Sequence, residues 1–156
     1  MADESIKSGL TAGFAASAAI GALMVIKGQL GILPALNPIA DIVAVADRYT
    51  GLQFPPSLGW VVHFFIGTVI WGILYTWIRK ILPGPAVVKG LIFGLLAWLA
   101  MMIVFMPVAG HGLFGLSLGI AVPGATLVLH LVFGAVLGAV YASTRGPAAI
   151  DDITPA

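Results

Sequence analysis

Long apolar segments, separated by short connections rich in glycine, proline or polar residues, dominate the pattern of this chain. A membrane-spanning helix needs about 20 predominantly apolar residues. Four segments meet this requirement, at residues 9–26, 58–78, 88–107 and 122–142. The pattern therefore predicts an all-α, polytopic membrane protein in which residues 1–156 form a single domain with four transmembrane helices.

The connection between the first two predicted spans has a helical signal of its own. Asn37 followed by Pro38 is typical of a helix start, and Gly51 is a natural stop. Between them, Asp41 and Arg48 share one face and apolar side chains the other. We expect a short amphipathic helix at about 37–51, lying in the membrane interface or packed over the bundle. The polar residues 146–156 predict a flexible C-terminal tail.

The second and fourth predicted spans carry related sequences. HFFIGTVIWGILYTWIR starts at His63, and HLVFGAVLGAVYASTR starts at His130. Each has a glycine four residues after the histidine, then a tyrosine, and an arginine four residues after the tyrosine. The segment between histidine and tyrosine is one residue longer in the first copy.

The first and third predicted spans match as well, through the pattern GLxxGxxA that starts at Gly9 and again at Gly90. We therefore expect two helical hairpins of the same design, with the short outer helix inserted in the first. Because both hairpins begin on the same side, they would be parallel repeats about an axis along the membrane normal.

Small residues recur at four-residue spacing in these spans. In lipid, such ladders let helix backbones approach closely and gain dispersion contacts. We expect these glycines to pack helices together. The set is Gly9, Gly13, Gly67, Gly90, Gly94, Gly134 and Gly138.

Composition supports the bilayer as the solvent. The chain is 60% hydrophobic and 8% charged, whereas a soluble domain carries about a quarter charged residues. A net charge of +1 without a basic cluster argues against a nucleic-acid partner. The absence of cysteine excludes disulfides, thiolate-held iron–sulfur clusters and c-type haem.

The basic residues predict the orientation. Five of them fall on one side of the predicted membrane and two on the other. The positive-inside rule then places both termini in the cytoplasm of a cell whose inner membrane holds the protein. The five are Lys7, Arg79, Lys80, Lys89 and Arg145, and the two are Lys27 and Arg48.

His63 and His130 are the main candidate functional residues. Each lies about 23 Å along its helix from the arginine that ends the copy, so both should lie at equal depth within the bilayer. Ionisable residues there are functional candidates. Three interpretations stay open. The histidines form hydrogen bonds between helices, or they ligate haem b or, together with His111, a metal ion. In the third, they belong to a proton or solute path.

The sequence contains no catalytic constellation. The predicted spans lack aspartate and glutamate, no serine has a neighbouring His–Asp arrangement, and no phosphate-binding glycine loop carries a lysine. His111, between two glycines in the second outer connection, is a solvated loop residue or a metal ligand. We expect no catalytic residues and, in the simplest case, no cofactor.

With the segments GLxxGxxA, HFFIGTVIWGILY, MMIVFMPVAGHGLFG and HLVFGAVLGAVY, the chain resembles a family of small four-helix prokaryotic membrane proteins of unknown function. The HxxxG pattern in the second and fourth spans is part of this resemblance. It implies an inner-membrane protein with four spans and supplies no activity.

Together these features favour a non-enzymatic integral membrane protein. We expect an interaction or accessory subunit whose glycine faces pack against a second copy or within a larger membrane complex. A bis-histidine haem b or metal-binding electron-transfer subunit is the alternative. A small-solute or proton transporter is the third.

Overall fold

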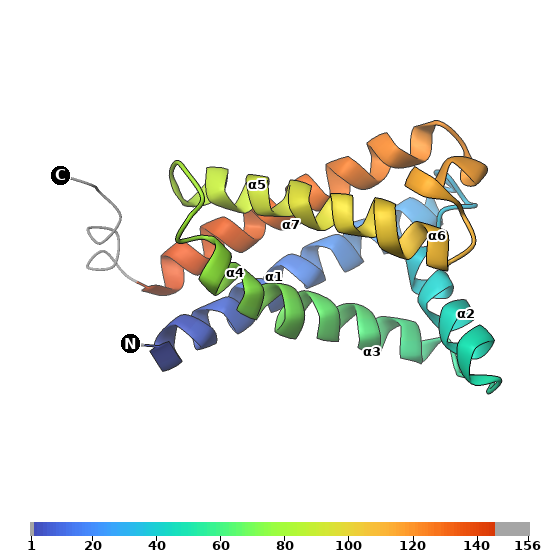
Figure 1. Cartoon of the computed structure of the whole chain (residues 1–156), viewed down its shortest axis with the longest axis horizontal. Helices are drawn as coiled ribbons and strands as arrows, with labels where there is room; N and C mark the ends of the chain where they lie inside the picture. Colours follow the sequence, from blue (N-terminus) through green and yellow to red (C-terminus); the bar gives the residue numbers. More distant parts are fainter. Residues whose placement is uncertain (1, 146–156) are drawn as a thin grey trace.

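The computed structural model describes residues 2–145, and helices occupy all four predicted spans (Figure 1). The membrane-length helices run over Glu4–Gln29, Ser57–Ile78, Ala86–Val108 and Ala121–Arg145. Only 17% to 39% of the apolar window of each is buried inside the chain. The remaining apolar surface faces outward and matches lipid, so the prediction of a four-span membrane protein is confirmed. The predicted tail at 146–156 lies outside the described residues.

Two of the spans change their helical pitch part-way. The first and fourth are the single helices α1 (Ala2–Gln29) and α7 (Ala121–Arg145). The second and third each contain a π-helical turn, where one extra residue fits into the helix. The second consists of α3 (Ser57–Phe65), η1 (Ile66–Trp71) and α4 (Gly72–Ile78), and the third of α5 (Ala86–Ala100), η2 (Met101–Phe105) and α6 (Met106–Val108).

The short helix predicted in the first connection is present as α2, Pro38–Thr50. The Asn37 side chain accepts a hydrogen bond from the Ala40 N–H at 3.2 Å. Gly51, with φ of 72°, ends the helix in the left-handed conformation that glycine adopts without strain. The connection between the third and fourth spans contains η3, Leu113–Leu118, whose 3-10 turns are interrupted by left-handed backbone at Phe114 and Gly115, with φ of 57° and 65°.

The two ends of the bundle differ in charge and structure. Figure 1 places the start of α1 beside the ends of α4 and α7, and α2 at the opposite end. We refer to them as the basic end and the α2 end. Because Ile39 of α2 is buried and its carbonyl lies against Gly59 of α3, α2 is packed on the bundle, as one of the two predicted arrangements required.

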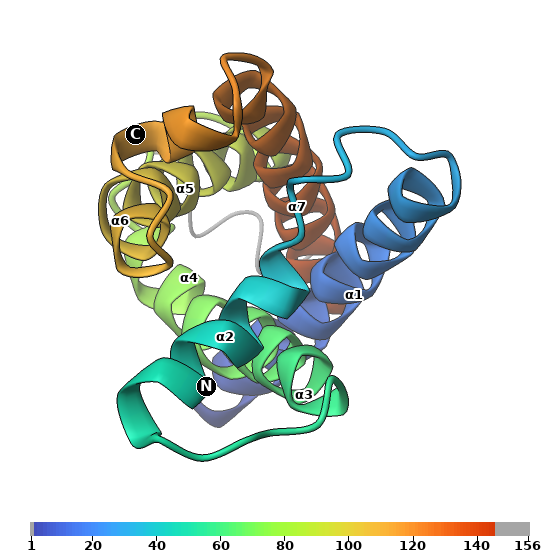
Figure 2. The same cartoon turned by 90° about the vertical axis from the view of Figure 1, so that its right-hand side faces the viewer.

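Three large packing interfaces and a smaller fourth one connect the four spans. Helix α7 packs against both α5 and α1, and α1 packs in turn against η1 and α4. The second and third spans meet mainly through α4 and α5. Figure 2, viewed from the α2 end, shows the four spans arranged around a central axis, with α2 beside α3. The first span thus packs against the second and the third against the fourth, as two hairpins require. That the two hairpins are repeats of one design stays a prediction.

Two buried clusters occupy different levels of the bundle. The larger contains Ala16, Tyr75, Phe93, Leu137 and Tyr141. The smaller lies toward the α2 end and is made by Leu36, Met102, Met106 and Val122. The helices are therefore tightly packed at two levels.

Candidate functional site

His63 and His130 line the same cavity. Its volume is about 370 Å³, within the range of small-molecule sites in proteins. All four spans contribute to its wall, and Ile42 of α2 lines it as well. The structure thus brings together the two histidines that the sequence placed at equal depth.

One ring nitrogen of His63 is tied to the first span. Its Nε2 lies 3.1 Å from the carbonyl oxygen of Ser17 in α1. A carbonyl only accepts hydrogen bonds, so Nε2 carries the hydrogen and Nδ1 keeps a lone pair. Edge contacts with Trp60 and Phe64, with ring centroids 5.9 and 5.4 Å away, hold the imidazole from the sides.

His130 is oriented by its own helix. Its Nδ1 lies 2.8 Å from the carbonyl oxygen of Thr126, one turn earlier in α7. This nitrogen therefore carries the hydrogen, and Nε2 keeps the lone pair. The Thr126 hydroxyl in turn accepts a hydrogen bond from the Trp98 indole at 3.1 Å, which ties the third span to the same turn.

The two free ring nitrogens are the distinctive polar groups of this cavity. Neither makes a further hydrogen bond with the described part of the chain. The Ser17 hydroxyl, also in the wall, already donates to the Gly13 carbonyl at 2.8 Å. Most other wall residues are apolar, among them Trp71, Met101 and Phe133. The wall is therefore mainly apolar and includes two histidines, each with one ring nitrogen left as an acceptor.

The glycines that the sequence assigned to helix packing lie at helix–helix contacts within the chain. Gly9 and Gly13 of α1 lie against the second span, where a Cβ on Gly13 would meet the Gly67 carbonyl oxygen at 2.6 Å. Gly90 and Gly94 of α5 lie against α7 in the same manner. The partners there are His130, Gly134 and Gly138. These ladders are therefore used inside the chain and leave no glycine face of the predicted set free for a partner.

The third histidine lies outside this cavity. His111 Nε2 is 2.9 Å from the Asp41 carboxylate of α2, and the two side chains are 19% and 16% exposed. Nearby, Arg48 donates to the Val108 carbonyl at 3.3 Å. Among the described side chains, residues 4–145, no three His, Asp or Glu are grouped closely enough to hold a metal ion. His111 thus connects α2 to the segment between the third and fourth spans.

Replacing His111 by alanine should loosen α2 without unfolding the spans. The substitution leaves the partly buried Asp41 carboxylate without its partner, which should cost about 1 kcal/mol. We expect faster amide hydrogen exchange in residues 38–50 and unchanged exchange in α7. Ser117→Ala, which removes a hydroxyl that donates to the His111 carbonyl but keeps the imidazole, is the control. Equal protection of α2 in both variants would contradict this role of the pair.

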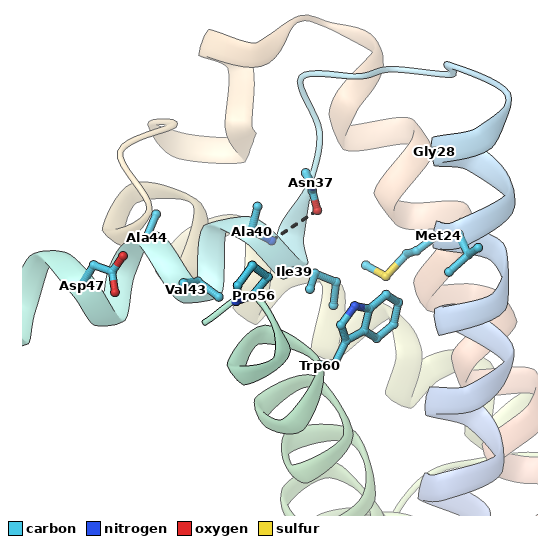
Figure 3. Close-up of a pocket in the computed structure, with 11 residues that line it drawn as sticks. Met24, Gly28, Asn37, Ile39, Ala40, Val43, Ala44, Asp47, Pro56 and Trp60 are labelled. Atoms are coloured by element: carbon cyan, nitrogen blue, oxygen red, sulfur yellow. Dashed lines mark hydrogen bonds between the residues drawn. The ribbon is translucent and has the colours of Figure 1, made fainter. Parts of the chain in front are cut away.

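A second and larger pocket, of about 510 Å³, lies at the α2 end between α1, α2 and α3. Figure 3 shows Met24 and Trp60 on its walls and Asp47 toward one side. The Asp47 carboxylate already accepts a hydrogen bond from the Phe54 N–H at 2.8 Å. No histidine lines this pocket, so it lacks the acceptor nitrogens of the histidine cavity. Met24 lines both.

Comparison with known proteins shows which family the chain belongs to. A family model matches residues 4–152, which include all four spans. The chain belongs to DUF6789, a family of unknown function. Searches of curated proteins and of solved structures each find no match. The DUF6789 assignment agrees with the resemblance to an unknown-function family and assigns no role to the histidine cavity.

Proposed function

We propose that this chain is a non-enzymatic membrane protein that binds a hydroxyl-bearing apolar molecule, such as a quinol, in the histidine cavity. The observation that supports this is the pair of free acceptor nitrogens on His63 and His130 within an apolar wall. An acceptor selects a ligand that donates hydrogen bonds. A ring with two hydroxyl groups supplies donors, and its apolar remainder suits the other walls.

The position of the cavity supports a ligand that arrives through the membrane. Val104 of η2 lines the cavity and is 61% exposed. The neighbouring second and third spans meet mainly nearer the basic end, through α4 and α5. We expect a lipid-soluble molecule to enter laterally, between the second and third spans.

Haem b is the second candidate for the same cavity. Metal-bound histidines donate their other ring N–H to a carbonyl or carboxylate, and both imidazoles are oriented in this way. However, His63 offers Nδ1, the nitrogen beside Cβ, where a macrocycle meets more crowding. The present orientation therefore suits a hydroxyl group better than iron.

Other roles have less support. A solute or proton path through the bundle would have to cross the larger cluster, where Phe93 and Leu137 are buried. A role as an accessory subunit or homo-oligomer stays a prediction, and the partner would have to use surfaces other than the glycine ladders. We also propose that the basic end faces the cytoplasm and that the membrane is the inner one, on the distribution of basic residues.

Ligand binding can be tested with a decyl-substituted hydroquinone and its dimethyl ether, titrated anaerobically by calorimetry into the protein in lipid nanodiscs. We expect the hydroquinone to bind at least tenfold more tightly, because the ether has no donor. His63→Leu and His130→Leu should each weaken hydroquinone binding about tenfold, the equivalent of one hydrogen bond. His111→Leu, outside the cavity, is the matched control.

Two results would contradict the proposal: equal binding of the hydroquinone and its ether, or equal binding by all three histidine variants. An optical titration with haemin distinguishes the second candidate. A Soret shift that requires both His63 and His130, without selective hydroquinone binding, would assign the cavity to haem b.

A further inference from the structure

Cationic side chains from three spans gather at the basic end of the bundle. Arg79 follows α4, Lys89 lies in the first turns of α5, and Arg145 is the last residue of α7. These spans converge around the buried rings of Tyr75 and Tyr141, whose centroids are 5.4 Å apart. The cluster is therefore built from residues distant in sequence.

The two arginines share one aromatic ring. The Arg79 guanidinium carbon lies 4.5 Å from the centroid of Tyr141, and that of Arg145 lies 5.9 Å from the same centroid. Arg145 also donates to the Tyr141 hydroxyl at 3.2 Å and to the Ser5 hydroxyl. Contacts with the ring hold both cations near each other despite their like charge.

Lys89 is a largely buried lysine near the start of α5. It is only 5% exposed and lies on the buried face of α5, one turn before Phe93. Phe93 contacts Tyr75, with ring centroids 5.3 Å apart. Lys89 thus lies one helical turn from a residue that packs on Tyr75, toward the same end of the bundle as the two arginines.

The charges of this cluster are not matched within the described chain. Among the side chains of residues 4–145, no carboxylate forms an ion pair with Arg79, Lys89 or Arg145. The Nε atom of Arg79 is buried and has no hydrogen-bond partner. A buried donor without a partner is unfavourable, and so is a nearly buried ammonium group without a counter-charge. An anion would relieve both.

We propose that the Arg79–Lys89–Arg145 cluster binds a phosphate group, as carried by the head group of an anionic phospholipid or by free phosphate. A phosphate presents several acceptor oxygens and matches the fork of donors on arginine. Basic pockets between spans, at the depth of lipid head groups, bind anionic lipids in this way. This site lies at the opposite end from α2 and does not depend on the ligand of the histidine cavity.

The test is calorimetric titration of the protein in neutral detergent with three probes: dihexanoyl phosphatidylglycerol, dihexanoyl phosphatidylcholine and inorganic phosphate. We expect phosphatidylglycerol to bind roughly tenfold more tightly than phosphatidylcholine. Lys89→Met and Arg79→Gln should each remove most of this preference, since each deletes a charge-assisted contact. Lys80→Met, at the exposed neighbour of Arg79, changes the net charge equally and is the control.

The probes also separate the two sources of phosphate. Binding of inorganic phosphate that equals that of phosphatidylglycerol and is lost in the same variants would make free phosphate the ligand, whereas weak phosphate binding supports the lipid head group. Far-UV circular dichroism establishes that the variants are folded. Equal affinity for the two lipids, or an equal loss in Lys80→Met, would overturn the proposal.

Discussion

Gly134→Ala should lower the free energy of unfolding of the bundle by about 3 kcal/mol, although it adds one methyl group. Gly134 lies where α7 crosses α5. A Cβ there would lie 2.8 Å from the carbonyl carbon of Gly90 and 3.1 Å from the Cα of Gly94. These are backbone atoms of a packed helix and cannot rotate away. The helices would have to separate, which forfeits dispersion contacts along their interface.

Gly124→Ala is the matched control because it makes the same change in the same helix. Nothing lies within 4 Å of a Cβ at Gly124, and alanine has the higher helix propensity, by about 1 kcal/mol. We expect this variant to be as stable as the parent or slightly more so. Denaturant titration in mixed micelles, followed by circular dichroism, measures both. Equal stability of the two variants would show that the α5–α7 crossing tolerates separation.

The spans were predictable because length and hydropathy alone determine what crosses a bilayer. The bounds of α2 were also predictable, since Asn37, Pro38 and Gly51 each act through local backbone geometry. These signals depend on neighbours in sequence. For the same reason they establish which segments are helical and leave open how the helices are rotated.

The difference between the two histidine helices has a local structural explanation. Gly67 and Gly72 are separated by one residue more than Gly134 and Gly138. The extra residue falls within the π-helical turn η1, so Gly67 and Gly72 both face α1. A π-turn absorbs one residue and restores the helix face beyond it. The sequence contained the offset, but propensity does not distinguish such a turn from a regular helix.

The walls of the histidine cavity were less predictable. His63 and His130 stood out as ionisable residues in apolar spans, whereas Met101 and Phe105 of the third span did not. In a uniformly apolar helix, hydrophobic periodicity does not indicate which side faces the interior. The basic cluster was missed for another reason. In a sequence, basic residues near the ends of spans indicate the orientation of the protein in the membrane. The burial of Lys89 depends on tertiary packing, which the sequence pattern does not show.

Lys27 also has a role that its sequence position did not reveal. From the sequence, Lys27 is one of two basic residues on the predicted outer side. In the structure its ammonium group donates to the carbonyls of Ile32, Leu33 and Leu36 at 3.0, 3.1 and 2.8 Å. These bonds hold the connection that places Leu36, 1% exposed, in the smaller buried cluster. The lysine therefore fixes a loop.

Lys27→Met should consequently destabilise the α2 end by about 3 kcal/mol, because three carbonyls lose a charged donor while the side chain keeps a similar length. Leu36 would leave the contact with Met102 and Met106, and residues 30–37 should become open to proteolysis. Lys80→Met, the same change at an exposed lysine, should leave both properties unchanged. If the two variants resist protease equally, the loop is held by Leu36 burial alone, and the three hydrogen bonds of Lys27 contribute little.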